Sequence, residues 1–161
     1  FSHCDKLVKI EFLNDSHLQE IGKDAFIFSS IESITIPSQV IRIKEGSFSE
    51  CKRLKCIRIP NDSNLQIIEK DAFFGSSIEN ITIPSKSKEL NEEWCRNVLN
   101  LSKIYVSPDY PLYTCFDEKF LLKKSSIEKT YYYSLCFCSR NIEIAIIPDF
   151  IEHICPYAFA D

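Results

Sequence analysis

Glycine is scarce in this chain of 161 residues, with only three occurrences. So few glycines leave no P-loop and no G-x-G-x-x-G turn, the glycine-rich motifs that bind nucleotide phosphates. No stretch of eighteen apolar residues occurs either, so no segment of the sequence is predicted to span a membrane. The formal net charge of −4 leaves no basic stripe, and nucleic acid is not an expected partner.

The most informative feature that is present is an internal duplication. The segment NDSHLQEIGKDAFIFSSIESITIPS, residues 14–38, recurs as NDSNLQIIEKDAFFGSSIENITIPS, residues 61–85, with 19 of 25 positions identical. Self-similarity at a fixed spacing is the mark of a repeat protein, in which similar units stack and stabilise one another. Such stacks present extended surfaces, so binding is the first function to expect.

Each duplicated unit contains two shorter repeats. Strand-like runs begin at Leu7, Ile31, Leu54, Ile78, Leu101 and Ile142, with successive starts 24, 23, 24, 23 and 41 residues apart. Leucine-rich repeats have periods of roughly 20 to 29 residues and one short strand in each repeat. Proline cannot donate to a sheet ladder, and it ends four runs, at Pro37, Pro60, Pro84 and Pro148. We expect parallel strands in one curved solenoid, near residues 9–12, 33–36, 56–59, 80–83, 103–106 and 144–147.

Side-chain alternation predicts which residues are buried. Every second side chain of a strand shares a face, so the fourth and sixth positions of each run should point into a common core. These positions hold Ile34 and Ile36, Ile57 and Ile59, and Ile81 and Ile83. An Ala-Phe or Ser-Phe pair follows in most repeats, and we expect its ring to stack on the ring of the next repeat. The rings are Phe26, Phe48, Phe73 and Phe159.

The repeated signature resembles that of BspA-like leucine-rich-repeat proteins. The matching pieces are SIESITIPSQVIRIKEGSFSECKRLKCIRIP (residues 30–60), NITIPS (80–85) and the terminal IPDFIEHICPYAFAD, and the resemblance covers nearly the whole chain. It implies an α/β repeat, a right-handed leucine-rich-repeat solenoid with a parallel, concave β-sheet. The family comprises surface proteins of mucosa-dwelling bacteria and of parasitic protists such as trichomonads, so the resemblance also implies adhesion or ligand binding without catalysis.

Two segments depart from the family pattern. Residues 86–100 lack the Ala-Phe pair and contain Trp94, Val98 and Leu99 in a charged stretch that could be helical. The repeat at residues 101–141 is about eighteen residues longer than the others. Within it, FDEKFLLKK and EKTYYYSLCFC flank Ser125-Ser126-Ile127, which predicts a hairpin that leaves the solenoid. With these two irregular repeats included, we expect residues 1–161 to be a single solenoid domain.

No constellation of residues indicates catalysis, and we expect neither an enzyme nor a cofactor. The three histidines, His3, His17 and His153, lie in no motif such as H-E-x-x-H. His17 aligns with Asn64 in the duplicate copy, where a catalytic base would be lost. Asp24 and Asp71 recur in two copies of K-D-A-F, which indicates a turn or cap in two equivalent places.

Six of the eight cysteines fall into two groups. Cys4 and Cys51 occupy equivalent repeat positions two coils apart, too far for a disulfide, so we expect them to fill the core as small apolar residues. Cys136 and Cys138 form a C-x-C pair in the predicted hairpin, and Cys115 and Cys155 are conceivable disulfide partners if the protein is exported. A metal site would need further C-x2-4-C pairs or histidines, so none is expected.

The ends of the chain and its sequons bear on location. The chain has no methionine, opens on FSHCDKL in the second half of a repeat, and closes on AFAD in the middle of another. We therefore expect a fragment of a longer protein, with any signal peptide or membrane anchor outside this sequence. Four N-x-S/T sequons fit a secreted protein that carries glycans, at Asn14, Asn61, Asn80 and Asn100.

Strand alternation also defines the expected binding surface, because the third and fifth positions of each run should face outward. Solenoids use such columns to bind partners. The column holds Lys9, Glu11, Ser33, Thr35, Cys56, Arg58, Asn80, Thr82, Lys103 and Tyr105. It becomes apolar at Ile144 and Ile146, and we expect the hairpin of the long repeat to cover these two side chains. Tyr131, Tyr132 and Tyr133 form a second candidate patch, unless they pack onto the solenoid.

The sequence favours a cell-surface or secreted adhesion module that binds a protein or glycan, such as a host-cell or extracellular-matrix component. The alternative is an intracellular scaffold that binds other proteins through the same face. The column does not identify its ligand, because the binding faces of repeat proteins vary independently of the core.

Overall fold

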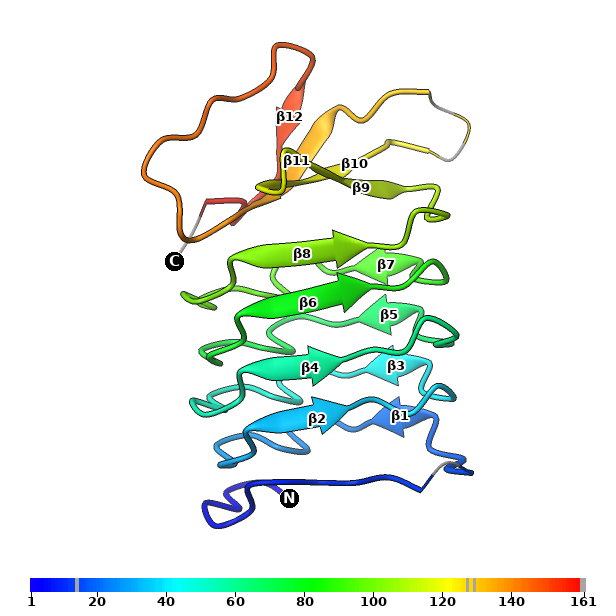
Figure 1. The fold of residues 1–161 in the computed structure, drawn as a ribbon, viewed down its shortest axis with the longest axis vertical. Coiled ribbons are helices and arrows are strands. Elements are labelled where there is room, and N and C mark those ends of the chain that lie inside the picture. Colours follow the sequence, from blue (N-terminus) through cyan, green and yellow to red (C-terminus); the bar gives the residue numbers. More distant parts are fainter. Residues whose placement is uncertain (14, 127, 129, 160–161) are drawn as a thin grey trace.

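The chain forms a solenoid of stacked coils in the computed structural model, which describes residues 1–13, 15–126, 128 and 130–159. Each regular coil has one strand at the front of Figure 1 and one two-residue strand at the rear. The front strands are β2 (Ser33–Thr35), β4 (Cys56–Arg58), β6 (Asn80–Ile83) and β8 (Lys103–Val106). The rear strands are β1 (Glu20–Ile21), β3 (Arg42–Ile43), β5 (Ile67–Ile68) and β7 (Glu89–Leu90).

Both sheets are parallel and follow chain order, β2-β4-β6-β8 at the front and β1-β3-β5-β7 at the rear. In Figure 1 the front strands run from left to right and the rear strands from right to left while the chain climbs, so the solenoid is right-handed. The register repeats the sequence period, since Ile34 pairs with Ile57 and Ile81 pairs with Ile104. The predicted right-handed solenoid with a period of 23–24 residues is confirmed.

The structure corrects the prediction in three places. The described residues contain strands and turns but no helix, so the return segments are β and not α, and residues 86–100 form turns around β7. Residues 9–12 contribute one bridge, from Lys9 to Ser33, and no full strand. The run at residues 144–147 is not a strand. Because no helix is found in the described part of the chain, none there has the length and hydropathy to span a membrane.

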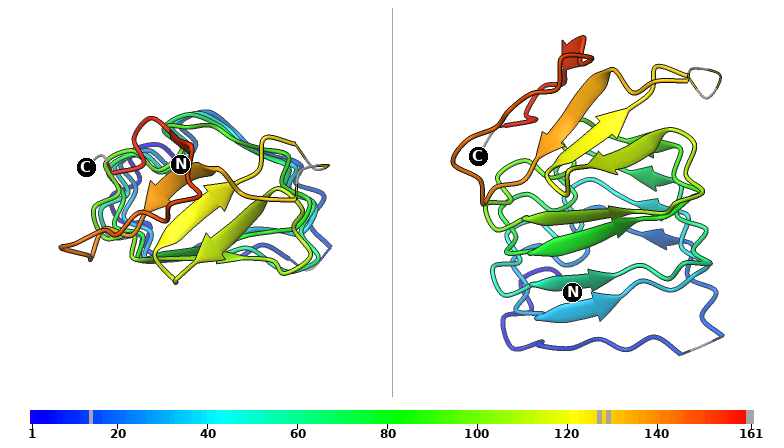
Figure 2. Two further views of the ribbon diagram at one scale, coloured as in Figure 1. Left: turned by 90° about the horizontal axis from the view of Figure 1, so that it is seen from above. Right: turned by 45° about the horizontal axis from the view of Figure 1, so that its top comes forward.

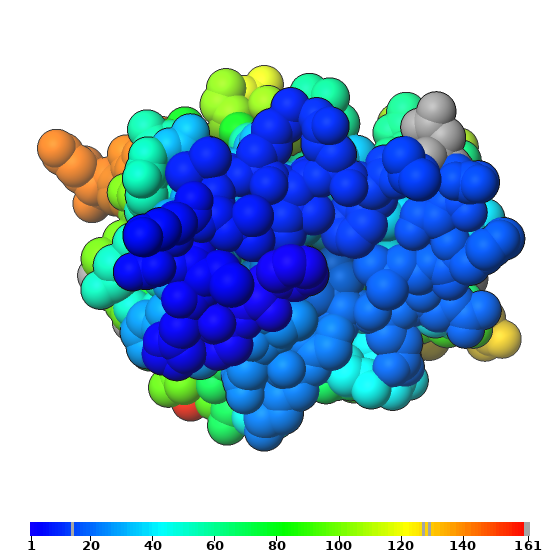
Figure 3. Space-filling view, turned by 90° about the horizontal axis from the view of Figure 1, so that it is seen from below, coloured from blue at the N-terminus to red at the C-terminus, as the bar shows by residue number. Residues whose placement is uncertain are grey.

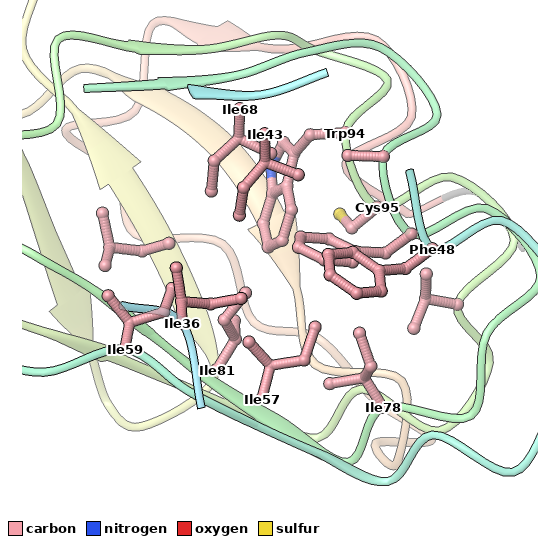
Figure 4. Close-up of a cluster of buried hydrophobic side chains, with 14 of the residues drawn as sticks. Ile36, Ile43, Phe48, Ile57, Ile59, Ile68, Ile78, Ile81, Trp94 and Cys95 are labelled. Atoms are coloured by element: carbon pink, nitrogen blue, oxygen red, sulfur yellow. The ribbon is translucent and has the colours of Figure 1, made fainter. Parts of the chain in front are cut away.

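The core consists of rows of identical or similar side chains, one from each coil. Ile34, Ile57, Ile81 and Ile104 form one row behind the front sheet, and all four are buried. Ile43 and Ile68 approach from the rear strands, as Figure 4 shows. The predicted inward face of the front strands is therefore confirmed. Burying such a row stabilises the stack because each coil removes apolar surface of its neighbour from water.

A column of aromatic rings runs beside the isoleucines. The ring centroids of Phe26 and Phe48 are 5.2 Å apart, and those of Phe48 and Phe73 are 5.7 Å apart. Trp94 continues the column in the irregular repeat, edge-on to Phe73 at 5.9 Å. The predicted stacking is confirmed for the first three rings and wrong for Phe159, which lies outside the column and is 45% exposed.

Two residues before and two residues after each stacked phenylalanine of the regular coils, the backbone has a positive φ and the chain turns. Asp24 and Asp71 have φ values of 54° and 53°, and Gly46 takes the equivalent position in the coil between them with φ 63°. The predicted turn role of the two aspartates is confirmed. Asp and Gly are among the residues that tolerate this conformation best.

The long repeat and the segment after it build a different structure on the last coil. Strands β9 (Tyr113–Phe116), β10 (Phe120–Lys123) and β11 (Ser134–Cys138) pair antiparallel, and β12 (His153–Ile154) joins β11 in parallel. The hairpin of β10 and β11 is thus confirmed, although Ile127 in its connection lies outside the described residues.

This second sheet does not leave the solenoid as predicted. It lies across the end of the coils (Figure 2), and Leu121 and Phe137 are buried in the same core as the isoleucine rows. We call β9 to β12 the end sheet. At the opposite end, the first residues of the chain spread over the lowest coil (Figure 3), where Phe1 stacks on Phe26 at 5.5 Å.

Candidate binding surface

The front face, defined as the solvent side of β2, β4, β6 and β8 with Lys9 and Glu11 before them, contains the predicted column from Lys9 to Tyr105. Lys9, Glu11, Ser33, Thr35, Arg58, Lys103 and Tyr105 are exposed, while Cys56, Asn80 and Thr82 are half-buried. The strand register brings them into two rows, because Thr35 pairs with Arg58 and Thr82 pairs with Tyr105. Residues more than twenty positions apart in the sequence thus form one continuous surface.

Several charged side chains outside the front face are paired between coils. Lys44 contacts Glu20 at 2.6 Å, and Lys70 contacts Glu93 at 3.3 Å. These pairs link one coil to the next. Exposed pairs of this kind contribute roughly 0–1 kcal/mol each to stability.

On the front face, two of the three cations have no acidic partner within ion-pair distance in the described part of the chain. These are Arg58 and Lys103, on alternate strands of the sheet. Lys9 is paired with Glu11 at 2.5 Å, and this hydrogen bond holds the pKa of Glu11 below its usual value. The centre of the front face therefore has positive charge available for a ligand, and its N-terminal edge does not.

Two open grooves run along the edge where the front strands end. One has a volume of about 610 Å³ and is lined by residues that include Lys9, Thr35 and Pro37. The other, of about 450 Å³, lies beside Tyr105, which is 53% exposed, and between Pro60, Pro84 and Pro108. The repeated Ile-Pro sequence had been interpreted only as a strand end, yet the prolines also line both grooves.

The tyrosine patch of the long repeat is only partly accessible. Tyr131 is 63% exposed, and its ring centroid is 6.1 Å from that of Tyr133. Tyr132 is half-buried against the second apolar cluster under the end sheet, with Lys124 Nζ 4.7 Å from its ring centroid. Tyr131 therefore faces water and stays a candidate binding residue, whereas Tyr132 packs on the protein.

The four sequons have different environments. Asn61 and Asn100 are exposed, whereas Asn80 is half-buried in β6 at the centre of the front face. Asn14 lies outside the described residues. A glycan on Asn80 would cover the candidate binding surface, and glycans on Asn61 or Asn100 would leave most of it open.

Ile144 and Ile146 are exposed, but strand alternation does not explain this because Glu143 and Ala145 are exposed as well, and the end sheet does not cover the two isoleucines. They are 78% and 83% exposed. Residues 139–152 loop out beyond the last coil (Figure 1). They contribute no strand to the front sheet, so the two isoleucines are not part of the front face. The prediction that the hairpin shields them was wrong.

The prediction that Cys4 and Cys51 fill the core is confirmed for Cys51, whereas Cys4 is only half-buried. Cys51 is fully buried and its thiol donates to the carbonyl of Phe26 at 2.9 Å. Burial raises the pKa of this thiol, which keeps it protonated and unreactive. In the end sheet, the sulfur atoms of Cys136 and Cys155 lie 3.2 Å apart. Across the described residues, no cluster of three or more side chains is arranged to hold a metal ion.

The repeats of this chain are similar to those of a known protein family and of solved structures. The BspA type leucine rich repeat region matches in six copies over residues 1–102 and 62–161. Among solved structures, the pneumococcal vaccine antigen PcpA is similar at 26% identity and a TM-score of 0.79, over 89% of this chain and 35% of that one. Among curated proteins, no sequence matches this chain.

Two further solved structures show the same fold. A leucine rich cell surface protein from Faecalibacterium prausnitzii A2-165 is 23% identical, with a TM-score of 0.70, over 94% of this chain and 45% of that one. A leucine-rich repeat protein from Eubacterium ventriosum ATCC 27560 is 20% identical, with a TM-score of 0.63, over 88% and 42%. This chain thus spans less than half the length of each. With the family signature over its whole length, the chain belongs to the BspA-type leucine-rich-repeat family.

Proposed function

We propose that the chain is a non-catalytic adhesion or ligand-binding module of a cell-surface or secreted protein, and that its front face binds a protein or glycan of a host cell or extracellular matrix. The observation that carries this proposal is that Arg58 and Lys103, exposed on alternate strands of the front face, have no acidic partner within ion-pair distance among the described residues. Tyr105, exposed between strand and groove, adds an aromatic surface.

The residue types on the front face support binding. Arg and Tyr are enriched among the side chains that dominate the affinity of protein interfaces. An unpaired cation also attracts acidic groups of a partner without first breaking an internal ion pair. The pneumococcal antigen at 26% identity fits a protein presented outside the cell.

Attachment assays with a double variant test the front face. Arg58→Ala with Tyr105→Ala should weaken attachment of the fluorescently labelled protein to cultured epithelial cells or to immobilised fibronectin, laminin or mucin by about 30-fold or more, since hot-spot truncation costs roughly 2 kcal/mol. Circular dichroism and thermal melting should stay unchanged, because both side chains are exposed.

The matched control is the double variant Lys23→Ala with Lys70→Ala. Both lysines are exposed and ion-paired behind the front face, following the rear strands β1 and β5, and attachment should persist. Undiminished attachment by the Arg58/Tyr105 variant would refute the front-face site, and loss on Tyr131→Ala would move the site to the end sheet.

Localisation is tested separately. Antibodies against residues of the front face should label intact, unpermeabilised cells that produce the protein. Labelling only after permeabilisation would favour the intracellular scaffold instead.

A further inference from the structure

The strands β11 and β12 bring two cysteines together. Ser134 pairs with His153 and Leu135 with Ile154, so the same register continued by one residue sets Cys136 opposite Cys155. The backbone N–H of Cys155 donates to the carbonyl of Leu135 at 2.8 Å and holds this register. Neighbouring strands lie about 4.8 Å apart, within the range of Cα separations that a disulfide spans.

The sulfur atoms are already in contact. They are 3.2 Å apart, against about 2.05 Å in a disulfide bond, so bond formation needs a movement of roughly 1 Å. In the described part of the chain this is the only contact between two cysteine sulfurs. Cys115 and Cys138, the other cysteines of the end sheet, have no sulfur neighbour of this kind.

The surroundings favour reaction at Cys155. The hydrogen bond shared with Cys136, assisted by His153 and Lys123, lowers the pKa of Cys155, although burial and the charge of Glu92 oppose this. The same hydrogen bond, together with burial, raises the pKa of Cys136. The two shifts favour ionisation of Cys155, and the thiolate is the reactive form of a cysteine.

We propose that Cys136 and Cys155 form a disulfide bond in an oxidising compartment, and that this bond fastens the C-terminal segment to the end sheet. The reaction needs a disulfide oxidant, such as glutathione disulfide or a thiol oxidase. The Cys155 thiolate attacks one sulfur of the oxidant and releases one thiolate. Cys136 then loses its proton to that thiolate or to water and attacks the Cys155 sulfur, which releases the second thiolate. Two electrons pass from the cysteine pair to the oxidant.

The bond would act on a weakly attached part of the molecule. Strand β12 has two residues, both exposed, and only β11 beside it. Ile144 and Ile146 in the preceding segment contribute exposed rather than buried apolar surface. A link across 19 residues removes much of the freedom of this segment in the unfolded chain.

Oxidation of the whole chain with glutathione disulfide tests the proposal. The oxidised protein should be lighter by two hydrogen atoms and should melt about 6–10 °C higher, with both changes reversed by dithiothreitol. Chymotrypsin cuts after Phe137 and so separates Cys136 from Cys138, and the linked peptides should contain Cys136 and Cys155. Trp94 lines the same small cavity as both cysteines and is the only tryptophan, so its fluorescence should change on oxidation.

Single variants sharpen the test. Cys136→Ser and Cys155→Ser should each abolish the reversible rise in melting temperature, whereas Cys115→Ser should keep it. The rate of bond formation should increase with pH up to the pH at which Cys155 is fully ionised. If both thiols remain open to alkylation after oxidation of the folded protein, or if the linked peptide contains Cys138 or Cys115, the proposal is wrong. None of these outcomes depends on ligand binding, so they are independent of the proposed function.

Discussion

Two runs of almost the same pattern behave differently in the two regions of this molecule. In the regular coils, IESITIP forms β2, with Ser33 and Thr35 exposed and Ile34 and Ile36 buried. In the C-terminal region, IEIAIIP is not a strand, and Ile144 and Ile146 are largely exposed. The comparison shows that the pattern alone does not make a coil. A run becomes a strand of the stack only where a preceding coil offers it an edge.

The end sheet explains the difference. Its antiparallel strands β9 and β10 follow β8, so the last run cannot pair with β8 as β8 pairs with β6. Ile142 and Ile147 instead pack against the second apolar cluster, formed by Phe120, Leu122, Leu135, Cys138 and Ala158. The alternation in the run is also altered, because Ala145 takes the fourth position, where the other runs have isoleucine.

The aromatic column offers the strongest way to test this contrast. Phe48→Ala should destabilise the protein by about 3–5 kcal/mol, the range for truncating a fully buried ring that stacks on two others. Phe159→Ala, at the half-exposed ring of the C-terminal region, should cost less than about 1 kcal/mol. Urea unfolding monitored by circular dichroism measures both.

Thr35→Ala is the matched control within the regular coils, because Thr35 is exposed on the front face one coil away from Phe48. It should change stability by no more than about 0.5 kcal/mol. Similar urea midpoints for the Phe48 and Thr35 variants would mean that the inward and outward faces had been assigned wrongly.

The regular coils could be predicted from the sequence because their information is local and repeated. Ile34, Ile57 and Ile81 occupy the same place in successive runs, so one assignment of faces predicts all three. The end sheet could be predicted only in part. FDEKFLLKK and EKTYYYSLCFC indicated β10 and β11, but β9 has no repeated counterpart, and the pairing of β11 with β12 joins residues about twenty positions apart.

The candidate site could also be predicted only in part from the sequence. Strand alternation predicted that Arg58, Lys103 and Tyr105 face outward, and the structure agrees. Alternation could not show that Lys9 is paired with Glu11 while Arg58 is free, because ion pairing depends on side-chain geometry between and along coils. Nor could it select Cys155 over Cys115 and Cys138 as the neighbour of Cys136, because β12 was not predicted.

A substitution in a turn of the regular coils should destabilise the protein less than Phe48→Ala does. Gly46→Ala should destabilise by about 1–3 kcal/mol, because φ is 63° there and an added Cβ would collide with Oδ1 of Asp24 in the preceding coil. Gly22→Ala is the control, since a Cβ at Gly22 meets no atom within 4 Å, and it should stay within about 0.5 kcal/mol of the wild type. Equal melting temperatures for the two variants would contradict the assigned turn.

The smallest expected effect concerns Glu93, which joins the two regions. Tyr157, in the C-terminal region, and Lys70, in a regular coil and 3.3 Å away, hold the pKa of its carboxylate below the usual value. A carboxylate with a lowered pKa in the folded state stabilises the fold above its unfolded pKa, and this contribution is lost as the pH falls through the folded value. Glu93→Gln should therefore narrow the difference in urea midpoint between pH 6.5 and about pH 3.5.

Glu89→Gln, at an exposed carboxylate of β7 for which the described residues show no ionic partner, should leave that difference as it is in the wild type. The same pH dependence in the Glu93 variant and the wild type would mean that this link does not couple the regions.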